Sequence, residues 1–109
     1  MKNMTLREID MAFGISRRAI QGYEKAGLVC ADGKNERGHL LYNEISQKRI
    51  KQIRLLQQIG FTIKEIKSLI DSPNDILKSA LENQIKKLEQ QKHDTEILIK
   101  VTNELIKKL

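Results

Sequence analysis

The sequence contains very few cysteine, proline or aromatic residues and no tryptophan. Its 109 residues include one Cys, one Pro, two Tyr and two Phe. The single Cys30 excludes an internal disulfide framework and any zinc or iron–sulfur site built from several cysteines of one chain. With so few aromatic residues the core must be aliphatic, and the composition favours a mainly α-helical protein over a β sandwich.

Long hydrophobic runs are also missing. No apolar stretch approaches the roughly 20 residues that a membrane-spanning helix needs, and the first five residues lack the apolar stretch of a signal peptide. We therefore expect a cytoplasmic protein without a membrane partner. We expect no enzyme activity, metal or cofactor either, because the sequence offers no nucleophile–base pair, phosphate-binding glycine loop or cluster of metal ligands in a convincing context.

Positively charged residues outnumber negatively charged ones. Lys and Arg number 20 against 14 Asp and Glu, which gives a formal net charge of +6. The excess lies in residues 1–72, which carry 13 basic and 8 acidic side chains. A basic domain favours a nucleic acid as partner, although an ordinary basic protein has a similar composition.

The sequence divides at Ser72 and Pro73 into residues 1–72, a compact domain, and residues 73–109. Serine is a good helix N-cap, and proline fits the first helical position. Because neither Gly nor Pro follows Pro73, we expect one helix of about 35 residues, about 50 Å long at ~1.5 Å per residue.

An apolar stripe runs along this predicted helix at spacings of three and four, as in a coiled-coil seam. A single helix cannot cover such a stripe, so we expect a homodimer. The alternative is a hairpin that folds back at the polar segment 90–95, where turn residues are missing. The predicted dimerisation residues are Leu77, Leu81, Ile85, Leu88, Leu98, Val101, Leu105 and Leu109.

Four short helices are predicted within residues 1–72. Capping boxes at Thr5 and Thr62 open the first and the fourth. Gly14 ends the first helix and Ser16 caps the second. Two short helices joined by a tight turn that contains glycine make a helix-turn-helix.

A hairpin, or wing, is predicted between the second and third helices. Its strands are residues 28–30 and 40–42, separated by the turn-rich segment 32–38. We expect Cys30 to be a small, half-buried residue of the first strand. Asn43 is expected to cap the third helix.

The second helix and the wing carry the predicted DNA contacts. Arg17 and Arg18 lie at a helix N-terminus, where they oppose the macrodipole, so an external phosphate partner would explain them. A merely solvated face is the alternative. Charged side chains at a wing tip suit the minor groove or flanking backbone, but are also common on soluble hairpins. The predicted DNA-binding residues are Arg17, Arg18, Tyr23, Lys25, Lys34, Arg37 and His39.

Four features occur together within residues 5–71: segment 15–20, segment 23–28, the pair Gly38 and Tyr42, and segment 55–66. In this combination the sequence resembles the MerR family of bacterial transcription regulators. The resemblance implies a winged helix-turn-helix domain, an antiparallel coiled-coil dimer through the long fifth helix, and a palindromic operator in double-stranded DNA. It also implies that the bound dimer distorts the promoter so that RNA polymerase can use it.

The resemblance assigns DNA contacts to Arg18 and to Tyr23, which matches the second tyrosine of the family's Arg-Tyr-Tyr-Glu signature. Gln21 and Gly22 stand where that signature has Arg and Tyr, and residues 39–40 are His-Leu where the wing usually has Tyr-Arg. Several phosphate contacts are therefore missing. Glycine within a helix is about 1 kcal/mol less favourable than alanine, so Gly22 either admits close approach of a partner or reflects relaxed constraint.

The family's effector sites lie C-terminal to the DNA-binding domain, and none is recognisable here, so we expect a short form without a separate effector-binding domain. The favoured function is a sequence-specific homodimeric transcription regulator. One alternative is an architectural or accessory DNA-binding protein, excisionase-like or chromosome-organising, that does not control polymerase. Another is a protein-interaction module whose coiled coil pairs with a different protein.

Overall fold

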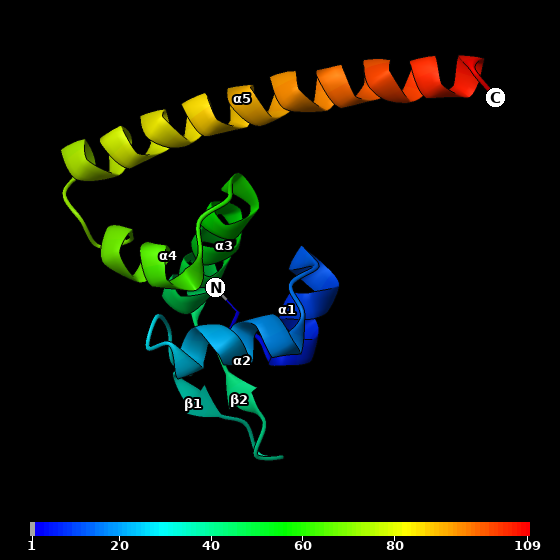
Figure 1. Cartoon of the computed structure of the whole chain (residues 1–109). Coiled ribbons are helices and arrows are strands. Elements are labelled where there is room, and N and C mark those ends of the chain that lie inside the picture. The colour runs from blue at the N-terminus through cyan, green and yellow to red at the C-terminus, as the bar shows by residue number, and fades with distance from the viewer. Residues whose placement is uncertain (1) are drawn as a thin grey trace. The chain divides into compact units, whose positions relative to one another are not determined.

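The computed structural model describes residues 2–109, which form five α-helices and a two-stranded hairpin (Figure 1). The helices are α1 (Leu6–Phe13), α2 (Arg17–Lys25), α3 (Glu44–Ile59), α4 (Ile63–Leu69) and α5 (Asn74–Lys107). The strands β1 (Gly33–Lys34) and β2 (Leu40–Leu41) pair antiparallel, with Gly33 opposite Leu41. The chain divides into two compact units, Met1–Asp71 and Ser72–Leu109. The predicted mainly helical fold, with a small wing and a long last helix, is confirmed.

Side-chain caps begin α1 to α4 at the residues that the sequence predicts. Thr5 and Thr62 each form a complete capping box. The side chains of Ser16 and Asn43 accept backbone N–H groups at the starts of α2 and α3. Gly14 ends α1 in the left-handed conformation, with φ of 67°. A tight turn therefore joins α1 to α2, as a helix-turn-helix requires.

The core of the first unit is mainly aliphatic, with Tyr23, Tyr42 and Phe61 as its aromatic members, and helices α1 to α4 all contribute to it. Burying an isoleucine side chain stabilises a fold by about 1.5–3 kcal/mol, so these contacts fix which face of each helix points inward. The fully buried large side chains are Ile9, Ile20, Tyr23, Tyr42, Ile50, Ile53 and Ile66.

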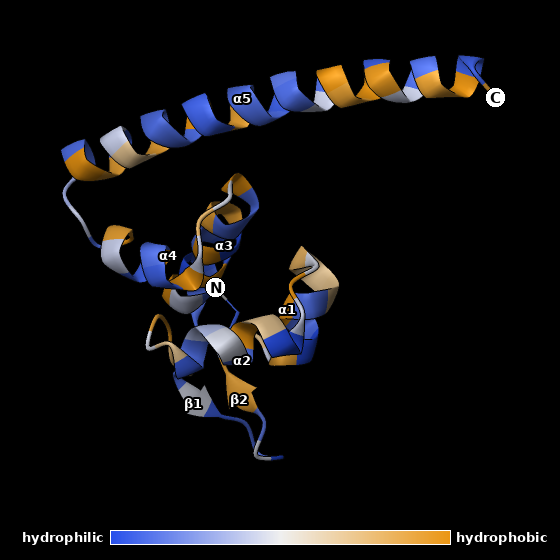
Figure 2. Ribbon diagram, in the orientation of Figure 1, coloured by the Kyte–Doolittle hydropathy of each residue, from blue (hydrophilic) through white to orange (hydrophobic). Residues whose placement is uncertain are grey.

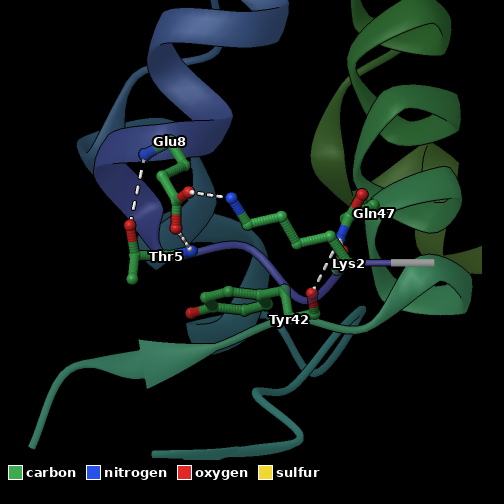
Figure 3. Close-up of polar contacts among 5 residues, drawn as sticks. All are labelled: Lys2, Thr5, Glu8, Tyr42 and Gln47. Atoms are coloured by element: carbon green, nitrogen blue, oxygen red, sulfur yellow. Dashed lines mark hydrogen bonds and ion pairs between the residues drawn. The ribbon is translucent and has the colours of Figure 1, made fainter. Parts of the chain in front are cut away.

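Polar contacts tie the N-terminal segment to the base of the wing (Figure 3). The backbones of Met4 and Tyr42 exchange two hydrogen bonds, of 2.9 and 2.8 Å. The Gln47 amide on α3 donates to the carbonyls of Lys2 (2.9 Å) and Tyr42 (2.8 Å). The Tyr42 hydroxyl donates to a carboxylate oxygen of Glu24 on α2. These bonds hold the start of α1, the wing and α2 in one fixed arrangement.

The first strand of the wing differs from its predicted position. Residues 28–30 form no strand, and β1 instead begins at Gly33. The reason is a tight turn, in which the Asn35 side chain accepts the N–H groups of Arg37 and His39, each at 2.9 Å. This turn allows β1 and β2 to pair close to the tip of the wing. Cys30 consequently lies outside the hairpin strands and is exposed, which contradicts the predicted half-buried strand position.

The ends of α5 also differ from prediction by one or two residues. Pro73, which contributes no side-chain cap bond, precedes the first helical residue Asn74, so Ser72 is not the N-cap. The helix ends at Lys107, which leaves Leu109 beyond it. The helix is continuous, so the alternative of a hairpin at segment 90–95 is wrong.

Candidate nucleic-acid interface

Helix α2 has one buried face and one exposed face. Ile20 and Tyr23 point into the core. None of the residues on the opposite, exposed face is acidic, and three of them are cations. The exposed residues are Arg17, Arg18, Gln21, Gly22 and Lys25.

A groove of about 610 Å³ lies between the start of α1, the exposed face of α2 and the wing. Arg7 from α1, Arg17 from α2 and Arg37 from the wing, three arginines from three separate elements, meet at its walls. The residues that line the groove are Thr5, Leu6, Arg7, Arg17, Gln21, Arg37, Gly38, His39 and Leu40. A concave surface with converging arginines and no acidic lining residue suits the phosphates of a nucleic acid.

The wing turn that presents Arg37 and His39 to this groove is held by local bonds. Besides its side-chain bonds, Asn35 makes two backbone bonds. Its N–H donates to the His39 carbonyl at 2.9 Å, and its carbonyl accepts the N–H of Gly38 at 3.0 Å. Gly38 has φ of 81°, a conformation that glycine adopts without strain. The wing tip therefore has a defined shape before any partner binds.

The structure brings together only some of the predicted DNA-binding residues. Arg17, Arg37 and His39 line the groove. Arg18 and Lys25 are exposed elsewhere on α2. Lys34 is exposed on β1, opposite Leu40. All six are thus accessible to a partner.

Tyr23 does not belong to this surface. Its side chain is 1% exposed, and its hydroxyl donates to Oε1 of Gln57 on α3 at 2.5 Å. Burial raises the pKa of the Tyr23 hydroxyl. The structure contradicts the predicted DNA contact, because a phenol held in the core cannot reach a phosphate. Tyr23 lies three residues after Ile20, and this apolar spacing in the sequence was the signal of its burial.

Two residues of the groove, Arg7 and Gln21, were missed as candidates. Arg7 lies in the first turn of α1 and opposes the macrodipole there, as Arg17 does in α2. An arginine in the first helical turn is thus a signal that Arg7 and Arg17 share in the sequence. Gln21 was noted only as a departure from the family signature, although its position on the exposed face of α2 was predictable from helical periodicity.

A smaller hollow of about 370 Å³ is lined by residues of the end of α1, the α1–α2 turn and α3, among them Phe13, Lys51 and Arg54. The Lys51 ammonium lies 4.2 Å from the centre of the Phe13 ring, a cation–π contact within the fold. Across residues 2–109, three or more His, Cys, Asp or Glu side chains nowhere gather as a metal site. In the same range no helix combines the length and apolar character needed to cross a membrane.

Comparison with known proteins gives matches along almost the whole chain. The model of the MerR HTH family regulatory proteins matches residues 4–72, and that of the MerR DNA-binding segment matches residues 47–105. Nodulation protein NolA of Bradyrhizobium diazoefficiens is 36% identical over 78 residues, which are 69% of this chain and 33% of NolA. The chain spans about a third of the length of the curated relatives that match it first.

Solved structures share the fold. MtaN, the N-terminus of the Bacillus subtilis multidrug transporter activator, is 26% identical with a TM-score of 0.73, over 94% of this chain and 97% of that one. HiNmlR, a MerR family regulator lacking the sensor domain and bound to promoter DNA, is 22% identical with a TM-score of 0.69, over 94% and 86%. Because HiNmlR is only 22% identical, its similarity to this chain shows a shared fold and nothing more.

The position of Tyr23 leads to a prediction that separates core from interface. Tyr23→Phe keeps the ring and removes only the bond to Gln57. We expect the free energy of unfolding to fall by about 1 kcal/mol, and the affinity for DNA to stay unchanged where the protein is folded. Urea unfolding and duplex titration measure the two quantities. A large loss of DNA affinity at unchanged stability would return Tyr23 to the interface.

Proposed function

The chain belongs to the MerR family of helix-turn-helix regulatory proteins, whose model matches residues 4–72, and from this membership we propose that it binds duplex DNA and regulates transcription. The observation that carries the proposal is the groove at which Arg7, Arg17 and Arg37 converge. Relatives such as the Bacillus subtilis activator mta, which is 30% identical over 79 residues, support regulation of transcription rather than a purely architectural role.

The geometry favours a particular mode of binding. The exposed face of α2 enters the major groove, where a helix fits and base edges are accessible. Arg7, Arg17 and Arg37 bind phosphates around it, while Lys34 approaches the flanking backbone from the wing. HiNmlR, bound to promoter DNA in its crystal structure, supports DNA binding by this fold.

In this proposal the protein acts in the bacterial cytoplasm at a palindromic promoter operator. Its two-fold symmetric dimer places one α2 helix on each half-site. Binding bends or untwists the promoter between the half-sites, and RNA polymerase is the partner that uses the deformed DNA.

The proposal predicts a specific loss in an Arg17→Ala variant. Because Arg17 lines the groove, we expect affinity for the duplex upstream of the protein's own gene to fall about tenfold, and the slope of log affinity against log salt to decrease by about 1. Fluorescence anisotropy at several salt concentrations measures both quantities, with a scrambled duplex for comparison. The matched control is Lys100→Ala, an exposed cation of α5.

Equal losses in the Arg17 and Lys100 variants would contradict the proposed interface, because the effect would then be one of net charge. Binding of the wild-type protein to both duplexes with equal affinity would favour the architectural alternative. Absence of binding to either duplex would contradict DNA binding altogether.

We further propose that α5 pairs with α5 of a second copy of the chain. The apolar stripe from Ile85 to Leu105 is exposed, with Leu98 at 63% and Leu105 at 58%. Figure 2 shows hydrophobic residues along α5, most densely toward its C-terminal end. A row of exposed leucines on a 34-residue helix needs a partner surface of similar length, and another α5 supplies one.

The order of residues along α5 supports an antiparallel register. Leu81 and Leu105, and likewise Leu88 and Leu98, are equidistant from residue 93. The flanking pair Ile85 and Val101 has the same midpoint. Two antiparallel helices that cross at residue 93 therefore place apolar side chains opposite apolar side chains.

The polar residues of the same stripe follow the same symmetry. Gln91 and Thr95 are equidistant from residue 93, as are Gln84 and Thr102. The Thr102 hydroxyl already donates to the Leu98 carbonyl at 2.7 Å. Burial of Thr102 between two α5 helices would therefore leave no hydroxyl donor without a partner. A shift by one heptad in one direction would place Leu88 opposite Gln91 of the second copy, and a shift in the other direction would place Leu98 opposite Thr95. Either shift leaves a polar side chain against an apolar one.

Disulfide cross-linking tests this register. In a Cys30→Ser background, we expect a mixture of Leu81→Cys and Leu105→Cys proteins to form a covalent heterodimer under mild oxidation, because the two positions face each other. The control is a mixture of Leu81→Cys and Leu98→Cys proteins. These two positions face each other only if the helices shift by one heptad. Non-reducing electrophoresis resolves the products. Preferential cross-linking of Leu81→Cys protein with itself would indicate parallel helices and contradict the proposed pairing.

A further inference from the structure

Gly22 lies inside α2, but nothing within the protein requires a glycine there. Its φ is negative, unlike those of Gly14, Gly27, Gly38 and Gly60. Apart from the adjacent residues and the backbone of α2 itself, a Cβ atom added at Gly22 would meet no atom within 4 Å. Because glycine weakens a helix relative to alanine, the fold alone would be served better by alanine at this position.

Gly22 instead belongs to the exposed face of α2. It lies next to Gln21 and one helical turn from Arg18 and Lys25. A helix without a side chain at this point exposes its backbone, and a partner can approach it more closely there than elsewhere. On the proposed DNA-binding face, that partner is the floor or wall of the major groove.

Gln21 has the chemistry to use such an approach. Its amide carries donors and an acceptor, is exposed, and takes part in no hydrogen bond among residues 2–109. It lies in the groove beside Arg17, so cations that bind phosphates flank it. A glutamine amide pairs with adenine through N6 and N7, whereas an arginine in the same place pairs with guanine through O6 and N7.

We propose that Gln21 and Gly22 together form the base-contacting element of α2. Gly22 lets the helix approach the groove floor, and Gln21 then donates Nε2–H to adenine N7 and accepts adenine N6–H at Oε1, once in each half-site. This inference rests on the proposed DNA-binding function and adds to it the base that is recognised and the residue that recognises it. Arg17 and Arg18 supply affinity on either side.

Selection from a library of randomised duplexes tests the role of Gln21. The wild-type protein should enrich adenine at one fixed position of each half-site. Gln21→Ala should lose the preference at that position and keep the others, and Gln21→Arg should change the enriched base from adenine to guanine. Gln52→Ala, an exposed glutamine on α3, is the matched control and should select the wild-type sequence.

The role of Gly22 is tested by a variant whose two effects have opposite signs. Gly22→Ala should raise the thermal midpoint of unfolding by a few degrees, because alanine favours the helix, and should lower affinity for the selected duplex about tenfold. Since the variant is more stable, misfolding cannot explain a loss of binding. Thermal unfolding by circular dichroism and anisotropy titration measure the two effects.

Each outcome decides the inference. If the wild-type protein selects a sequence and Gln21→Ala selects the same one, the inference fails while the proposed function stands. Unchanged affinity of Gly22→Ala would show that the glycine reflects relaxed constraint, which overturns the close approach. A wild-type protein that selects no sequence would overturn both the inference and sequence-specific binding.

Discussion

The arrangement of the candidate interface depends on the burial of one face of α2. Ile20 and Tyr23 are almost completely enclosed, and the Tyr23 hydroxyl is bonded to Gln57 on α3. Because a helix places residues three and four apart on one side, fixing these two side chains fixes the opposite face as well. The charged residues of α2 therefore point outward as a group. The core of the first unit determines which side chains a partner meets.

The exposed side of this unit gathers charge that the fold itself does not neutralise. Arg7, Arg17 and Arg37 line one groove without an acidic neighbour in its walls. Bonds among the N-terminal segment, Tyr42 and Gln47 (Figure 3), together with the bond from the Tyr42 hydroxyl to Glu24 on α2, hold the three contributing elements together. Like charges brought together on a rigid surface repel each other, and an anionic partner relieves that repulsion. The same arrangement that is unfavourable in isolation thus favours binding to a polyanion.

Local chemistry made much of the fold predictable, and long-range packing explains what was missed. The capping residues Thr5, Ser16, Asn43 and Thr62 act on their own helices, so the sequence locates these helix starts correctly. The wing strands depend on the side-chain bonds of Asn35 within the turn, which composition alone does not reveal.

At the site, helical periodicity identifies the exposed cations of α2 but not their neighbours in space. The meeting of Arg7 with Arg37 depends on the folded arrangement of α1 and the wing. Tyr23 follows the apolar spacing that it shares with Ile20, which predicts burial, and not the DNA contact that the family signature implies. The structure leaves the predicted cations of α2 and the wing exposed, buries Tyr23, and places Arg7 in the same groove as Arg17 and Arg37.

In the proposed complex, a symmetric pair of α2 helices binds one stretch of promoter DNA. Hydroxyl-radical footprinting of the protein on the duplex upstream of its own gene should then show two protected patches, related by two-fold symmetry. Spacing by whole turns of the double helix should place both patches on one face of the DNA. Protection spread evenly along the duplex, or a single patch without a symmetric counterpart, would contradict the proposed complex.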